Sequence, residues 1–197
     1  MVDADERYVT ETWHGSPAAE ASVGRALVLP GGYYSVDQPL LFWACHVLAQ
    51  ASWRVVTMRW RWEDTEDRLR FVEDGAARLD LEAGPAARTL VVAKSLGCYA
   101  AAWASAHDYP AVWLTPVLTD DFVADALGRY STSALLVGGS ADRVWDSARA
   151  TGTGLRRLEI PGADHGLQLF DWRSSIAVLQ QTLTAIDDFA CEVAAET

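Results

Sequence analysis

The stretch Leu90-Val91-Val92-Ala93-Lys94-Ser95-Leu96-Gly97 decides the fold class. Its first residues belong to an apolar run over residues 89–93, which is typical of a strand buried on both faces of a sheet. An alanine-rich helical pattern follows at once over residues 96–107. A strand that turns sharply into a helix is the setting of a nucleophile elbow, in which the turn lifts a serine hydroxyl above the sheet. Ala93 and Gly97 lie two residues on either side of Ser95 and are small enough to relieve crowding in such a turn. A serine at this place can also simply cap a helix.

Short apolar runs alternate with helical patterns along the rest of the chain, as in βαβ units. We expect strands over residues 7–13, 25–29, 54–58, 89–93, 111–114, 134–138 and 155–160. We expect helices over residues 38–51, 65–81, 96–107, 121–127, 144–150 and 174–194. The predicted fold is a single α/β domain over residues 1–197, with a mainly parallel sheet of about seven strands and helices on both faces. Ligands of such sheets bind beyond the carboxyl ends of the strands.

The composition of the chain argues against several classes of binding partner. The formal net charge of the 197 residues is −11, which argues against nucleic acid and against anionic membrane surfaces, because both attract basic proteins. The three cysteines follow no metal-binding spacing. The acidic, polar start over residues 1–7 lacks the basic and apolar regions of a signal peptide. We therefore expect a cytoplasmic protein, and the sequence leaves a homodimer open.

Two further strand ends carry residues that could activate a serine. Asp142 follows the predicted strand 134–138, and His165 follows the predicted strand 155–160. Serine, acid and histidine then occur in the chain order that nucleophile-elbow enzymes use, and all three lie at one edge of the sheet. A serine needs such a base, oriented by a third group, to become a nucleophile. Asp120 and Asp121 are rival acids at the end of the preceding strand, although we expect them to cap the next helix.

Acyl transfer also needs two main-chain donors for the developing negative charge on oxygen. The N–H of Leu96 lies at the start of a helix, where such charge is favoured. The loop Pro30-Gly31-Gly32-Tyr33-Tyr34 follows an earlier strand, and its glycines allow close approach to a ligand. We expect the second donor to be Gly32, with Tyr33 as the alternative.

Together these segments resemble the α/β-hydrolase superfamily, and within it the small dienelactone-hydrolase-like enzymes. The matching stretches are residues 27–32, 93–98, 138–142 and 162–166. The resemblance implies that Ser95 attacks an acyl carbon, His165 transfers the proton and Asp142 orients the imidazole, without a metal or organic cofactor. The sequence departs from the family where Ala93 replaces a glycine and where Pro30-Gly31 replaces His-Gly. Dienelactone hydrolases themselves use cysteine as nucleophile, so their lactone substrate is not carried over.

Only residues 115–133 separate two of the predicted strands at the place where many relatives insert a lid. That is too short for a cap domain, so we expect an open site for a small-molecule ester or thioester. Five aromatic residues next to strand ends are expected to shape the substrate pocket: Tyr34, Trp60, Trp62, Trp145 and Trp172. Each of them could equally pack a loop onto the core. The competing class is a non-catalytic binding module on the same scaffold, since a fold does not fix a function.

Overall fold

A computed structural model describes residues 7–64 and 67–196 of the chain. Seven strands form one sheet in the order β1-β3-β2-β4-β5-β6-β7. The strands are β1 (Tyr8–Thr12), β2 (Gly24–Leu29), β3 (Trp53–Trp60), β4 (Thr89–Lys94), β5 (Ala111–Leu114), β6 (Ala134–Gly139) and β7 (Arg156–Ile160). Only β1 runs antiparallel to its neighbour, and the other pairings are parallel. The predicted mainly parallel α/β sheet is confirmed.

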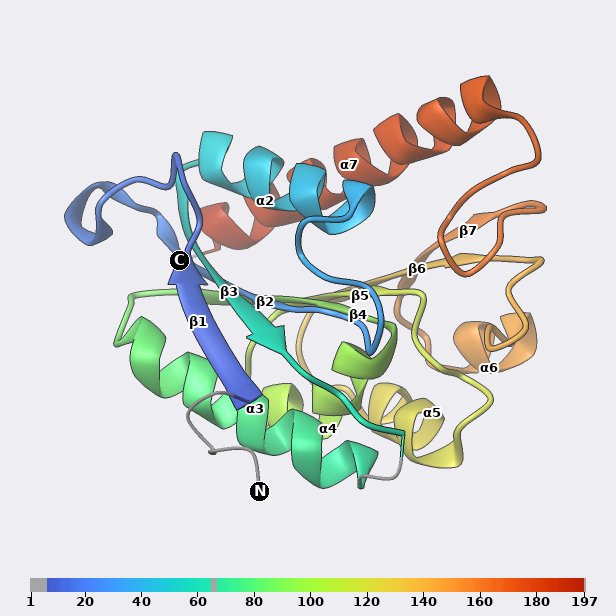
Figure 1. The fold of residues 1–197 in the computed structure, drawn as a ribbon, viewed down its shortest axis with the longest axis horizontal. Helices are drawn as coiled ribbons and strands as arrows, with labels where there is room; N and C mark the ends of the chain where they lie inside the picture. The colour runs from blue at the N-terminus through green and yellow to red at the C-terminus, as the bar shows by residue number, and fades with distance from the viewer. Residues whose placement is uncertain (1–6, 65–66, 197) are drawn as a thin grey trace.

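Helices cover both faces of this sheet (Figure 1). The helices are α2 (Pro39–Gln50), α3 (Arg68–Ala83), α4 (Ala101–Ala106), α5 (Asp121–Gly128), α6 (Ser147–Gly152) and α7 (Trp172–Ala195), and the short 3₁₀ helices are η1 (Ala19–Ala21) and η2 (Ser95–Ala100). Helices α2 and α7 lie on one face, whereas α3, α4 and α5 lie on the other (Figure 1).

The alternation of side chains along the central strands explains these two layers. In β2, Leu27 and Leu29 belong to the core under α3 and α4, and Ala26 and Val28 belong to the core under α2 and α7. Successive side chains of a strand point to opposite faces. A strand that is apolar at every position therefore needs a helix layer on each side.

The largest differences from the predicted boundaries lie at the starts of helices, whereas strand ends differ by at most two residues, as where β3 continues to Trp60. The predicted helix 96–107 begins as the 3₁₀ helix η2, and the predicted helix 144–150 begins only at Ser147, after Asp146 accepts a hydrogen bond from the N–H of Arg149. The predicted helix 65–81 begins at Arg68, with Asp67 as its cap, and residues 65–66 lie outside the described part. The side chain of Asp171 caps α7 two residues earlier than predicted.

Within the described residues, no helix is both long enough and apolar enough to cross a bilayer. Between β5 and β6 the chain forms α5 and short turns, without a cap domain. The carboxyl ends of β4, β6 and β7 therefore open onto one uncovered edge of the sheet, where the functional side chains predicted from the sequence lie.

Candidate active site

The turn after β4 holds Ser95 in a left-handed backbone conformation, with φ at 51°. This conformation costs a non-glycine residue on the order of 1 kcal/mol or more. The helix start packs closely against the end of β2. The N–H of Gly97 donates to the Pro30 carbonyl over 3.1 Å, and a β-carbon at Gly97 would lie 2.7 Å from that oxygen. Gly97 therefore allows the close packing that keeps the strained turn in place.

A chain of hydrogen bonds joins the three residues that the sequence singled out. The Nε2 atom of His165 lies 2.8 Å from the Ser95 hydroxyl, and its Nδ1 atom lies 2.7 Å from the Asp142 carboxylate. The second carboxylate oxygen of Asp142 accepts the N–H of Val144. Because the side chain of Asp142 is only 2% exposed, the carboxylate is fixed and poorly hydrated. It can orient the imidazole and stabilise a positive charge on it.

The rival carboxylates have other partners. Asp120 accepts the Tyr99 hydroxyl at 2.6 Å and caps α5 through the N–H of Phe122. Asp121 forms an ion pair with Arg149. The arrangement favours Asp142 as the residue that orients His165.

The loop between β2 and α2 approaches the nucleophile from the other side. The N–H of Gly31 is used within the loop, where it donates to the Tyr34 carbonyl. A β-carbon at Gly31 would lie 3.6 Å from the Ser95 Cβ, and Gly32, Tyr33 and Leu96 all line the cavity above the serine. Gly32 and Leu96, the two expected main-chain donors, therefore border the same cavity. The Tyr33 side chain is 75% exposed and donates its hydroxyl to Asp64.

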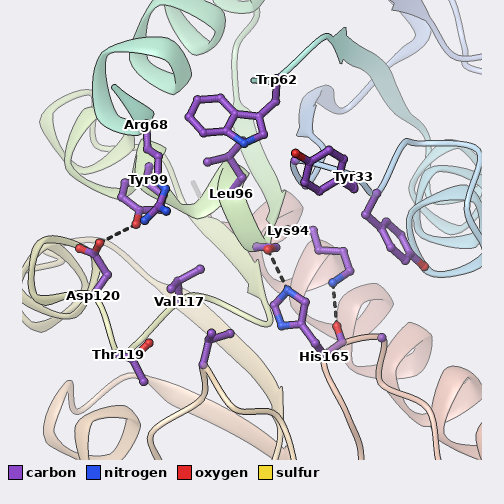
Figure 2. A pocket seen from close by; sticks show the side chains of 16 residues that line it. Tyr33, Trp62, Arg68, Lys94, Leu96, Tyr99, Val117, Thr119, Asp120 and His165 are labelled. Carbon is purple, nitrogen blue, oxygen red and sulfur yellow. Dashed lines mark hydrogen bonds between the residues drawn. The ribbon is translucent and has the colours of Figure 1, made fainter. Parts of the chain in front are cut away.

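A cavity of about 640 Å³ lies over Ser95 and His165 (Figure 2). Ligand sites of small molecules are usually of this size. Of the five aromatic residues expected to shape it, Tyr34 and Trp62 line the cavity. The structure places the other three elsewhere.

These three tryptophans pack or support other parts of the chain. The Trp60 indole donates to the Gly31 carbonyl and packs on Phe71, so it supports the loop from behind. Trp145 is buried against Gly138. Trp172 is 66% exposed at the start of α7 and lines a separate, neighbouring cavity. The expectation that Trp60, Trp145 and Trp172 line the substrate pocket is corrected accordingly.

The cavity also contains polar residues that the sequence analysis did not assign to it. Arg68, Tyr99 and Asp120 form a group at one end of the cavity (Figure 2). Burial, together with the hydrogen bond to Asp120, raises the pKa of Tyr99 to about 12, so its hydroxyl stays a donor. Lys94 also borders the cavity, beside His165 (Figure 2). Two of these residues carried a signal in the sequence: Asp120 is a carboxylate that follows a strand, and Lys94 is a charge at the end of an apolar strand.

The order of the strands, the uncovered edge of the sheet and the turn at Ser95 are those of an α/β-hydrolase fold without a lid. Solved structures of similar fold cover nearly the whole chain. Est1E from Butyrivibrio proteoclasticus has a TM-score of 0.73, with 13% identity over 98% of each chain. XC6422 from Xanthomonas campestris, an α/β serine hydrolase without a lid, has a TM-score of 0.69, with 16% identity over 96% of this chain and 90% of that chain. The esterase Pf2001 from Pyrococcus furiosus also has a TM-score of 0.69, with 11% identity over 90% of this chain and 86% of that chain.

No protein-family model matches the sequence, and no curated protein matches it significantly. The resemblance recognised in the sequence is confirmed at the level of the fold.

Proposed function

We propose that this chain is a serine hydrolase that cleaves a carboxylic ester or thioester of a small molecule through an acyl-enzyme. The observation that carries the proposal is the continuous hydrogen-bond chain Ser95–His165–Asp142 beneath an open cavity. A binding module needs no base behind a serine and no buried carboxylate behind that base. The similar folds of serine hydrolases and esterases support the same class.

The geometry supports a two-step reaction. His165 takes the hydroxyl proton of Ser95 as the oxygen attacks the acyl carbon, and Asp142 stabilises the imidazolium. The negative charge on the carbonyl oxygen faces the N–H groups of Leu96 and Gly32. The bond to the leaving alcohol or thiol then breaks, and His165 gives it the proton. Water, activated by His165, attacks the acyl-serine and releases the acid.

The lining of the cavity suits an apolar or aromatic acyl group. Tyr34, Trp62, Leu96 and Val117 provide aromatic and aliphatic surface around the nucleophile. Aromatic side chains bury large apolar areas and stack on other rings. Est1E, whose fold is similar, binds ferulic acid, an aromatic acid. We propose aryl and medium-chain acyl esters as the first substrates to compare.

The test is covalent labelling with a fluorophosphonate, read by intact mass. We expect one adduct on the wild-type protein and none on Ser95→Ala. Ser131→Ala, which removes an exposed serine outside the cavity lining, should label like the wild type. Absence of an adduct on the folded wild-type protein would contradict the proposal and favour the binding module.

A further inference from the structure

Lys94 is a buried charge that the proposed reaction does not use. It is the last residue of β4, directly before Ser95, and its exposed fraction is 0%. A charged group is costly to remove from water unless partners replace the water. The groups that surround the Lys94 ammonium group therefore indicate its role.

Three partners surround the Lys94 Nζ atom. It donates to the Thr115 hydroxyl and to the main-chain carbonyl of His165, each over 2.8 Å, and it lies 4.6 Å from the ring centre of Tyr34. Figure 2 shows the Lys94 side chain reaching down to the main chain at His165. An ammonium group has three donors and no acceptor. Two oxygens and one aromatic face match that set.

Stability alone gives no reason for a lysine here. A methionine would fill a similar volume without the cost of burying a charge, and replacing buried ionic groups by apolar ones is often neutral or stabilising. What the lysine adds is a connection: it joins the strand of the nucleophile to Thr115, the residue after β5, and to the loop between β7 and α7 through His165.

The hydrogen bond from Lys94 to the His165 carbonyl matters for the reaction, because the loop that carries His165 determines where its imidazole lies. Its imidazole must meet Ser95 on one side and Asp142 on the other, while 41% of its side chain is exposed. A shift of about 1 Å in such a pair can lower a rate by roughly 100-fold. Lys94 holds the main chain of this loop at the residue whose ring must be aligned.

We propose that Lys94 is a positioning residue: its ammonium group fixes the His165 main chain, so that the serine–histidine pair is aligned while Lys94 carries its proton. This inference rests on the proposed serine hydrolase function.

The charge state of Lys94 falls in an accessible pH range. Burial lowers the pKa of its ammonium group to about 8, against the opposing effects of Cys98, Asp142 and Asp164. Burial also raises the pKa of the Cys98 thiol, so the two carboxylates are the charges that stabilise the ammonium group. The titratable groups around Lys94 come from four elements and are Tyr34, Cys98, Asp142, Asp164 and His165.

The test is the pH dependence of fluorophosphonate labelling between pH 6 and pH 10. For the wild type we expect the rate to fall as the pH rises through about 8, because the neutral amine of Lys94 holds the His165 carbonyl by a weaker hydrogen bond than the ammonium group does. Lys94→Met should label about 10- to 100-fold more slowly at pH 7 and should lack this alkaline decline. A Lys94→Met protein that labels at the wild-type rate, or keeps the decline, would overturn the proposal.

A milder variant covers the case in which Lys94→Met does not fold. Thr115→Val removes one acceptor of the ammonium group and keeps the volume. The charged form loses a hydrogen bond, so the alkaline decline should move to lower pH. Thr184→Val, on the exposed side of α7, should leave the decline in place. An unmoved decline in a folded Thr115→Val protein would contradict the role of Lys94.

Hydrogen exchange at one fixed pH supplies a readout that needs no activity. We expect faster exchange of residues 161–171 in Lys94→Met than in the wild type, and no change in Thr184→Val. Exchange of residues 161–171 at the same rate in Lys94→Met and in the wild type would overturn the proposal that Lys94 anchors this loop.

The two proposals fail in different ways. A wild-type protein that does not label would contradict the proposed hydrolase function, whereas a wild-type protein that labels, together with a Lys94→Met protein that behaves like it, would overturn only the role of Lys94.

Discussion

At the scale of single residues, the candidate site depends on which carboxylate orients His165. Asp142 touches the imidazole, and its side chain is almost wholly buried. We predict that Asp142→Asn lowers the fluorophosphonate labelling rate by roughly 10²–10⁴-fold, because an amide neither holds the productive tautomer nor stabilises the imidazolium. Asp121→Asn, which alters the rival acid, should stay within a few-fold of the wild type. Comparable losses in both variants would contradict the assignment of Asp142.

The residue scale also shows why part of the pocket could not be predicted. Sequence places Trp145 three residues after Asp142, but it does not say which way the indole points. In the structure the ring occupies the space left by Gly138, where a β-carbon would lie 2.1 Å from it. Its N–H donates to Glu159. Strand ends are readable from apolar runs and turn residues, whereas the direction of a loop side chain depends on packing partners far away in the chain.

At the scale of secondary-structure elements, the contact between η2 and the end of β2 holds the site together. A β-carbon at Gly97 would lie 2.7 Å and 2.9 Å from the Pro30 and Leu29 carbonyl oxygens, which are main-chain atoms that cannot turn aside. We predict that Gly97→Ala lowers the free energy of unfolding by about 1–3 kcal/mol. It should also slow labelling about tenfold or more, because the two proposed main-chain donors move apart.

The matched control is Gly128→Ala in α5, where a β-carbon meets nothing within 4 Å. Alanine suits a helix better than glycine by roughly 0.5–1 kcal/mol, so this variant should be neutral or slightly more stable in chemical denaturation. A Gly97→Ala protein as stable and as reactive as Gly128→Ala would show that the close packing is dispensable.

The elements themselves were largely predictable. Each expected strand is present. The central strands β2, β4, β5 and β6 are buried at every position and leave largely apolar runs, and helices separate the strands with a different periodicity. The start of the helix after Ser95 was not predicted as a 3₁₀ turn. Its geometry depends on the hydrogen bond from Gly97 to Pro30, which joins segments that are distant in sequence. The assignment of the Ser95, Asp142 and His165 roles stays a prediction.

At the scale of the whole molecule, the site is reached without moving any covering domain. The chain between β5 and β6 forms only α5 and turns, so no lid has to open before a substrate enters. We predict that a bulky, biotin-linked fluorophosphonate labels Ser95 at a rate comparable to that of a small one, and that detergent does not accelerate either. A large preference for the small probe that detergent removes would indicate a gated site.

The order in which β4, β6 and β7 follow one another along the chain has a consequence for the synthesis of the protein. Ser95, Asp142 and His165 follow β4, β6 and β7, so they leave the ribosome in that order. A nascent chain that has emerged as far as α6 contains the serine and the carboxylate but not the imidazole. With the proposed roles, the chain stays chemically inert until residue 165 has been added. It becomes able to react only when the loop before α7 is in place.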